Sequence, residues 1–152
     1  MRINVKAIAD EGEALRGSEP GSIVELVDPD ISFPNPVEYD LWAQLQGRAL
    51  LVTGKVWSAA QLRCSRCLKL FPQRVEAAEF VLHQELQGED FVDLTPQMRE
   101  DMLLQLPQRA LCQPACKGLC PVCGKDLNGG ACQCRVEQTS LQWHALDKLN
   151  LK

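Results

Sequence analysis

The eight cysteines of this 152-residue chain are arranged in four close pairs. In chain order the pairs are Cys64 with Cys67, Cys112 with Cys116, Cys120 with Cys123, and Cys132 with Cys134. Two thiolates in one turn of chain can occupy two corners of the tetrahedron around a zinc ion, which binds sulfur at about 2.3 Å. Four pairs complete two such sites and leave no thiol over. The sequence therefore predicts zinc as the cofactor, with two structural ions per chain.

Two divisions of the pairs between the sites are open. In the first, the last two pairs close a local site over fifteen residues, with Asn128-Gly129-Gly130 as the flexible return, and the first two pairs form the other site. In the second, the middle two pairs bind together and the outer two pairs form the other site. We favour the first division, with the sites Cys64, Cys67, Cys112, Cys116 and Cys120, Cys123, Cys132, Cys134. One zinc site with spare thiols, or a set of disulfides, are the remaining alternatives.

The cysteine content and the lack of recognisable targeting segments indicate the cellular compartment of the protein. Residues 1–5 contain no apolar segment of a secretory signal, and no apolar run approaches the ~20 residues of a membrane span. Free thiols persist in reducing compartments, where metal binding is a commoner use of cysteine than disulfide formation. We therefore expect a cytoplasmic protein that has no contact with membranes.

Basic residues gather in the segments that contain cysteine, although the net charge of the chain is −4. Residues 41–75 include six basic residues and no acidic one, and residues 102–136 include four basic residues and one acidic one. Such a surface could contact RNA phosphates, but it could also simply balance anionic metal–thiolate clusters. The candidate RNA-contacting residues are Arg63, Arg66, Lys69, Arg74, Lys117 and Lys125. Aromatic residues make up only 5% of the chain, which favours recognition of phosphates and shape over base stacking.

Two catalytic interpretations use fewer of these residues. His83-Gln84-Glu85 with Cys120 and Cys123 imitates a zinc deaminase signature, but leucine rather than proline precedes Cys120 and six cysteines have no role. A redox-active Cys64–Cys67 pair would need a βαβ setting, whereas β-rich sequence surrounds this pair. We expect a non-enzymatic protein without a small-molecule substrate.

The elements that must position the cysteines are β-strands in the first half of the chain. Apolar residues alternate along 37–46, glycines bound a second strand at 49–52, and residues 74–84 form another strand whose phase changes near Ala78. Weaker alternation predicts strands at 3–7 and 23–27, with turns at 17–21 and 28–30. Trp42, Trp57 and Trp143 are expected to pack in the core or against the lobe.

Helical signals dominate the second half. Thr95 is the expected N-cap of a helix near 96–106, Pro107 stops that helix, and a short amphipathic helix begins at Ser140. The predicted fold class is α+β, with an antiparallel β-sheet or partial barrel, one main helix and a small cysteine-rich, zinc-binding C-terminal lobe. Residues 1–107 would form the β-rich domain. Residues 108–152 would form the lobe, which shares one metal site with Cys64 and Cys67.

Several stretches together resemble the YceD family, bacterial and plastid proteins linked to accumulation of large-subunit ribosomal RNA. They are Cys64-Ser65-Arg66-Cys67-Leu68 with Phe71, Leu106-Pro107, the segment 116–124, Leu127-Asn128, Cys132 and Cys134. The resemblance covers residues 37–150, and residues 1–36 match only in being weakly β.

This resemblance implies a role in biogenesis of the large ribosomal subunit. The expected partner is a large-subunit rRNA precursor or a pre-ribosomal particle, and a ribosomal protein is a further candidate. The alternative is a zinc-stabilised adaptor between proteins, whose partner would be a ribosomal protein or a nuclease. Basic residues beside the cysteines suit the first role, and the two acidic blocks suit the second.

Overall fold

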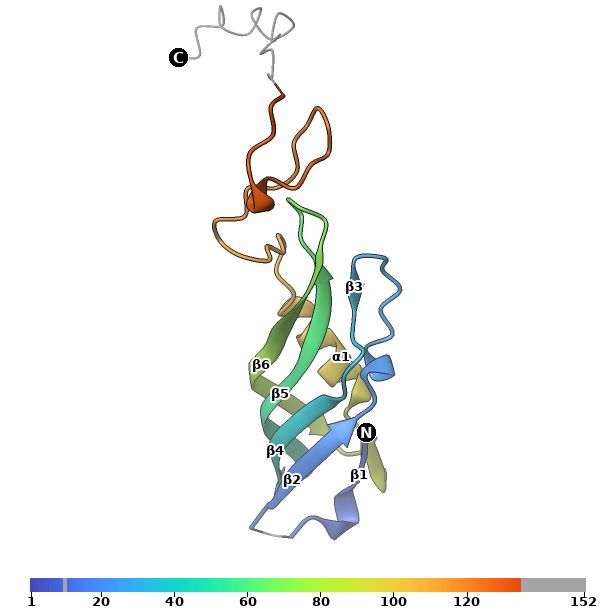
Figure 1. Ribbon diagram of the computed structural model, residues 1–152. Helices are drawn as coiled ribbons and strands as arrows, with labels where there is room; N and C mark the ends of the chain where they lie inside the picture. The colour runs from blue at the N-terminus through green and yellow to red at the C-terminus, as the bar shows by residue number, and fades with distance from the viewer. Residues whose placement is uncertain (10, 135–152) are drawn as a thin grey trace, which may run out of the picture.

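A curled antiparallel sheet makes up most of the protein, and the loops of residues 108–134 extend from one end of it (Figure 1). The computed structural model describes residues 1–9 and 11–134, so the helix expected from Ser140 and the placement of Trp143 lie outside the described residues. The strands are β1 (Arg2–Asn4), β2 (Glu13–Glu19), β3 (Ile31–Ser32), β4 (Val37–Gln46), β5 (Ala49–Arg63), β6 (Leu70–Glu85) and β7 (Phe91–Asp93). The helix α1 spans Thr95–Leu104, and 3-10 helices span Val5–Ala7, Gly21–Val24 and Leu127–Gly129.

The sheet is organised around β5, which pairs with three other strands. β4 pairs with its first half, β3 pairs with its last residues, and β6 pairs along its other edge. β2 extends the sheet beyond β4, while β1 and β7 form a separate two-stranded ribbon. All of these pairings are antiparallel, as the sequence predicts.

The hairpin of β5 and β6 bends at a bulge in its middle. Ala78 and Glu79 together lie opposite Lys55, because Gly54 pairs with Phe80 and Val56 pairs with Ala77. Gly54 has a φ of 148°, and a Cβ there would lie 2.3 Å from the backbone oxygen of Asp40, so this position requires glycine. The bulge confirms the phase change expected near Ala78, and it curls the sheet.

The hydrophobic core fills the inner side of this curl. Leu41, Val52, Val56 and Phe80 are fully or almost fully buried there, as the alternation along each strand predicts. The helix α1 covers this side and contributes the buried Met98 and Met102 (Figure 1). The expected α+β fold with a partial barrel and one main helix is confirmed. No helix among the described residues is long and apolar enough to cross a membrane.

Several weaker predictions for residues 1–36 are wrong. The segment expected as a turn at 17–21 lies largely in β2, where Gly17 pairs with Tyr39 of β4. The segment expected as a strand at 3–7 leaves the strand after Asn4, whose side chain accepts a hydrogen bond from the backbone N–H of Lys6 and starts a 3-10 helix. The segment 23–27 contributes to a second 3-10 helix rather than to a strand.

Three side chains also differ from expectation, and one of them is Trp57, which shares the outer face of the sheet with Trp42 and is half-buried. Thr95 is the first residue of α1 rather than its N-cap, which is Leu94. The carboxylate of Asp93 accepts a hydrogen bond from the Thr95 N–H at 3.0 Å. Trp42 is not a core residue: it follows the buried Leu41 on β4, so alternation directs it to the outer face, where it is 44% exposed.

Candidate metal centres

The described cysteines form two clusters of four sulfurs. Cys64, Cys67, Cys112 and Cys116 make up cluster one, and Cys120, Cys123, Cys132 and Cys134 make up cluster two. Within each cluster all ligand atoms lie within 4.8 Å of one another, and every cysteine is a free thiol. These are the two sets of the division that the sequence favours. Cluster one is largely buried, whereas Cys123 of cluster two is exposed.

Distances in cluster one fit a tetrahedral metal site. The Sγ atoms of Cys64 and Cys116 are 3.8 Å apart, and those of Cys67 and Cys112 are 3.6 Å apart. Sulfurs at about 2.3 Å from a central metal form a tetrahedron with edges of about 3.8 Å. A disulfide would need about 2.05 Å between the sulfurs. Both clusters could therefore hold a metal ion, and cluster one joins the tip of the β5–β6 hairpin to the following chain.

The two Cys-x-x-Cys turns share one backbone hydrogen-bond frame, which we call the knuckle. In the first knuckle the Cys64 N–H donates to the Lys69 oxygen at 2.9 Å, and the Leu68 N–H donates to the Cys64 oxygen at 2.9 Å. In the second knuckle the Cys120 N–H donates to the Lys125 oxygen at 2.8 Å, and the Gly124 N–H donates to the Cys120 oxygen at 2.9 Å.

The residue after the second cysteine of each knuckle has a left-handed backbone. Gly124 has a φ of 70°, which glycine adopts without strain, whereas Leu68 has a φ of 61°. A left-handed conformation costs an L-residue about 1–2 kcal/mol. The sequence indicates the second knuckle through its glycine, but leucine gives no such signal, so the equivalence of the two turns is visible only in the structure.

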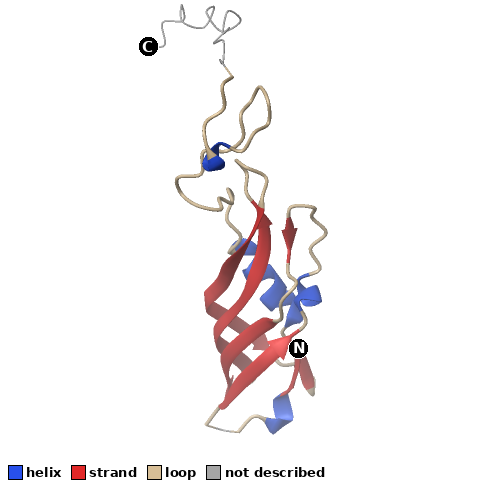
Figure 2. Cartoon of the chain, in the orientation of Figure 1, coloured by secondary structure: helices blue, strands red, loops and turns tan. Residues whose placement is uncertain are grey.

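The lobe, whose described part is residues 108–134, docks on the first knuckle through backbone hydrogen bonds. The Ser65 N–H donates to the Ala110 oxygen at 2.9 Å, and the Leu119 N–H donates to the Arg66 oxygen at 3.2 Å. Figure 2 shows that the lobe consists of loops and one short 3-10 helix over its described residues. Since loops of this kind bury little apolar surface, the cysteine clusters are the main features that can hold it together.

Asn128 is a supporting residue that the sequence presents only as part of a flexible return. Its side-chain NH₂ donates to the Cys116 Sγ at 3.4 Å and to the Asp126 carboxylate at 2.8 Å. Its side-chain oxygen accepts a hydrogen bond from the Lys117 N–H at 2.8 Å. A residue next to cluster two thereby orients a sulfur of cluster one.

Within each cluster the thiols differ in acidity. Burial raises the pKa of Cys64, but backbone N–H groups of Cys112, Cys67 and Arg66 outweigh it and lower this pKa to about 6. Burial and neighbouring thiols raise the pKa of Cys112 to about 12. In cluster two, the backbone N–H groups of Cys123 and Val122 lower the pKa of Cys120 to about 6, and the Cys123 side chain raises that of Cys134 to about 12. Four adjacent thiolates repel one another, so the four thiols of a cluster can all lose their protons only when a bound cation balances the charge.

The basic residues nearest cluster one have partners inside the molecule. Arg63 pairs with Asp30 at 2.6 Å, and Lys69 pairs with Asp126 at 2.5 Å. Arg66 donates to the Cys116 oxygen at 2.6 Å. Of the six candidate RNA-contacting residues, these three therefore link the first knuckle to the β3 region and to the lobe.

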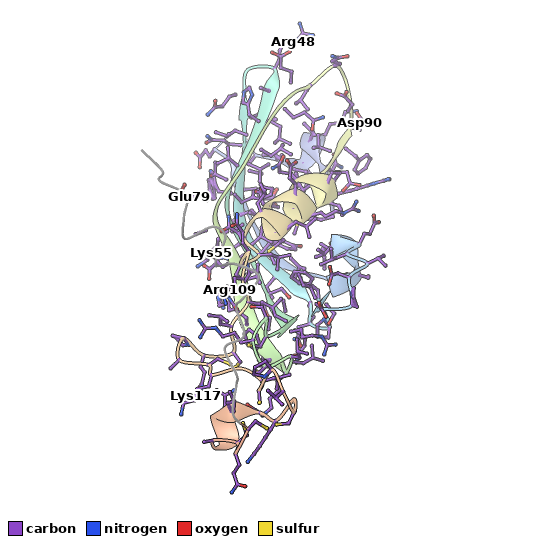
Figure 3. The ribbon with its side chains drawn as sticks, turned by 90° about the horizontal axis from the view of Figure 1, so that it is seen from above. Arg48, Lys55, Glu79, Asp90, Arg109 and Lys117 are labelled. Carbon is purple, nitrogen blue, oxygen red and sulfur yellow. The ribbon has the colours of Figure 1, made fainter. Side chains whose placement is uncertain are left out.

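The remaining candidates are less engaged. Arg74 pairs with Glu76 on β6, and the Lys125 ammonium donates to the Ala131 oxygen at 3.2 Å. The ammonium of Lys117 makes no ion pair with any residue that the structure describes. Figure 3 places Lys117 on the lobe and Arg109 at the base of it. His83 of the deaminase-like pattern lies on β6 opposite Leu51 and belongs to neither cysteine cluster.

Comparison with known proteins adds a family and several relatives. A family whose description is "Large ribosomal RNA subunit accumulation protein YceD" matches residues 52–150, a span that contains all eight cysteines. Uncharacterized proteins of Mycobacterium bovis and Mycobacterium tuberculosis are 31% identical to this chain over an alignment of 158 residues. The alignment covers 86% of this chain and 75% of theirs. No solved structure matches.

A plant protein matches over a shorter stretch. The large ribosomal RNA subunit accumulation protein YCED homolog 1 of Arabidopsis thaliana, a chloroplastic protein, is 33% identical over 58 residues. The match covers 38% of this chain and 18% of the plant protein.

Proposed function

The chain belongs to the YceD family, and on that premise we propose that it promotes the accumulation of large-subunit ribosomal RNA as a non-enzymatic factor. In this proposal it binds precursor RNA or a pre-ribosomal particle through the lobe. The carrying observation is that the matched span contains both cysteine clusters and the basic residues around them. We place the protein in the cytoplasm in this proposal, because free thiols persist in a reducing compartment.

Each cluster, we propose, binds one zinc ion. Tetrahedral sets of four thiolates are typical of zinc or of iron–sulfur centres, and pairs of cysteines in short turns are typical of structural zinc. A zinc ion with four protein ligands has no open position for a substrate. Its role in this chain would therefore be to fold the lobe and hold it on the β5–β6 hairpin.

The contacts of the basic residues divide them between two roles. Arg63, Arg66 and Lys69 hold the knuckle and lobe together, so replacing them would test folding as much as RNA binding. Lys117 and Arg109 carry no such structural duty among the described contacts. They are the sharper probes of RNA binding.

The test is a salt titration of affinity for large-subunit precursor RNA with wild type and with the Arg109→Gln/Lys117→Gln variant. Each lost phosphate contact should reduce the slope of log affinity against log salt by about 0.7 to 0.9. The matched control is Arg2→Gln/Arg48→Gln, which also removes two exposed positive charges. Arg48 lies at the end of the sheet away from the lobe (Figure 3), and Arg2 lies on β1, where it pairs with Asp93. Equal slopes for all three proteins, with metal content unchanged, would count against RNA binding by the lobe.

One observation favours the alternative role of a protein–protein adaptor. Exposed apolar side chains lie on or beside the knuckles, namely Leu68, Leu70 and Val122. A partner such as a ribosomal protein or a nuclease could bury them. Crosslinking in cells separates the two roles, because the adaptor would crosslink to protein through the lobe while the RNA-binding factor would crosslink to rRNA.

A further inference from the structure

The outer face of the sheet carries two tryptophans away from the metal clusters. Trp42 lies on β4 and Trp57 on β5, and both belong to the phase of their strands that points away from the core. Trp42 is 44% exposed and Trp57 is half-buried. Large aromatic side chains are usually buried, so the location of Trp42 and Trp57 on the outer face suggests that they contact a ligand there.

Small residues leave a hollow beside Trp42. Across the ladder from Trp42 are Ala14 of β2 and Thr53 of β5. These residues, with Gly54 and Ala78 at the bulge, line a hollow of about 440 Å³ whose rim also includes Trp42, Arg16, Asp40, Leu41 and Lys55. The indole of Trp42 thus borders a shallow, open hollow, and it also lies against Gly12, where an added Cβ would be 2.8 Å from the ring.

Cations surround the second tryptophan. The Lys55 ammonium is 5.4 Å from the centre of the Trp57 ring, and the Arg74 guanidinium is 5.2 Å from it. A second hollow of about 340 Å³ is lined by Trp57, Arg74 and Asn35, among others. Lys55, which contacts the Trp57 ring, also lines the hollow beside Trp42, so it lies between the two tryptophans.

Indole faces next to cations suit a ligand that is planar and anionic. Bases stack on aromatic side chains with little dependence on sequence, and Arg or Lys beside them contacts the phosphates. Trp57 is four residues along β5 from Thr53, the partner of Trp42, which separates the two sites by about 13 Å along the strand. One single strand can cross both hollows, whereas a duplex hides the faces of its bases.

We propose that this outer face binds unpaired nucleotides of single-stranded RNA, with one base stacked on Trp42 and the backbone passing Lys55 toward Trp57. This inference rests on the proposed function in one respect, namely that the bound RNA is large-subunit ribosomal RNA. Acidic residues share the face: Glu38 and Glu76 lie opposite Trp57, and Asp40 and Glu79 lie opposite Lys55. Two of the basic side chains are already paired there, Arg16 with Asp40 and Arg74 with Glu76. Binding therefore relies on stacking and on local phosphate contacts rather than on a broad positive field.

The experiment measures tryptophan fluorescence of the full chain while a short single-stranded oligoribonucleotide is added. In a Trp57→Phe/Trp143→Phe background, Trp42 is the only tryptophan, and its emission should be quenched on binding. In the wild-type background, Trp42→Leu should weaken binding about tenfold, within the range that one stacked base contributes. Trp42→Phe should restore most of the affinity, because a phenyl ring also stacks.

Two further variants guard against a general loss of fold. Phe91→Leu removes another exposed aromatic side chain, on β7, and should leave affinity unchanged. Glu79→Gln removes a negative charge at the bulge and should strengthen binding two- to threefold, as one weakly screened charge near a phosphate would. A damaged fold would not produce such a gain.

The outcomes separate this inference from the proposed function. If Trp42→Leu binds as tightly as wild type, or if a duplex quenches Trp42 as well as a single strand does, the stacking face is refuted. RNA binding by the lobe could still stand on the salt titration. Conversely, loss of the gene without any change in large-subunit rRNA would remove the proposed function but leave the oligonucleotide result intact.

Discussion

Cys67→Ser removes one sulfur from the cluster that joins the β5–β6 hairpin to the lobe. Cys67 and Cys112 are 45 residues apart in the chain, so a metal that bridges them closes a long loop. A crosslink over that length constrains the unfolded chain by about 4 kcal/mol. The free energy of unfolding of the metal-loaded protein should fall by about this amount, which corresponds to a thermal midpoint lower by about 10 °C.

Cys123→Ser is the matched control, because it removes one sulfur from cluster two instead. That cluster lies wholly inside the lobe, and it contributes no ligand from the β-sheet. Unfolding of the sheet, followed by the near-ultraviolet signal of its tryptophans, should therefore have a midpoint close to that of wild type. Both variants should retain one metal ion.

Hydrogen exchange locates the damage in each variant. In Cys67→Ser the amides of Ser65 and Leu119 should lose protection, since they bond across the docking contact between knuckle and lobe. In Cys123→Ser the amides of Cys120 and Gly124 should lose protection while Ser65 keeps it. The reasoning fails if Cys67→Ser leaves the docking amides protected, or if both variants lower the midpoint of the sheet equally.

Three other predictions concern the metal, its support and the start of α1. Native mass spectrometry of protein purified without chelator should show two zinc ions per chain, and paired disulfides with no metal would contradict this. Asn128→Ala, which loses the contacts to the Cys116 sulfur and the Lys117 N–H, should weaken the binding of one zinc ion 10- to 100-fold in a chelator competition. The Thr95 hydroxyl and N–H lower the pKa of Asp93 below its ordinary 3.8, so its carboxylate stabilises the fold above that pH. The difference in stability between wild type and Asp93→Asn should be constant near neutral pH and vanish as the pH falls through the lowered pKa; a difference that persists in strong acid would contradict this.

Local, strongly patterned features of the sequence were sufficient to predict their structures. The strand over residues 37–46 has the bounds expected from its alternation, because one face is buried and the other is not. The close cysteine pairs correctly predicted that each pair supplies two sulfurs to one cluster, but they left open which pairs combine, and only the fold decides that. Weakly patterned segments failed where distant partners decided the structure. Gly17 suggests a turn by type, but pairing with β4 holds it in a strand.

Other features depend on contacts that carry no local signal. The left-handed Leu68 is stabilised by the knuckle hydrogen bonds and gives no warning in the sequence. The role of Asn128 depends on a sulfur twelve residues away. The ion pair of Lys69 with Asp126 joins segments that are far apart in the chain, so a basic residue that suggests RNA contact by composition is also a structural link.

The location of cluster one at the tip of a hairpin has a consequence for synthesis of the protein. Cys67 is made 45 residues before Cys112, which at 5–20 residues per second is a delay of roughly 2–9 s. During that interval the growing chain presents a bare dithiol that can hold a metal by two sulfurs only. All seven strands among the described residues end before Cys112, so each of these strands is synthesised before cluster one has its four sulfurs.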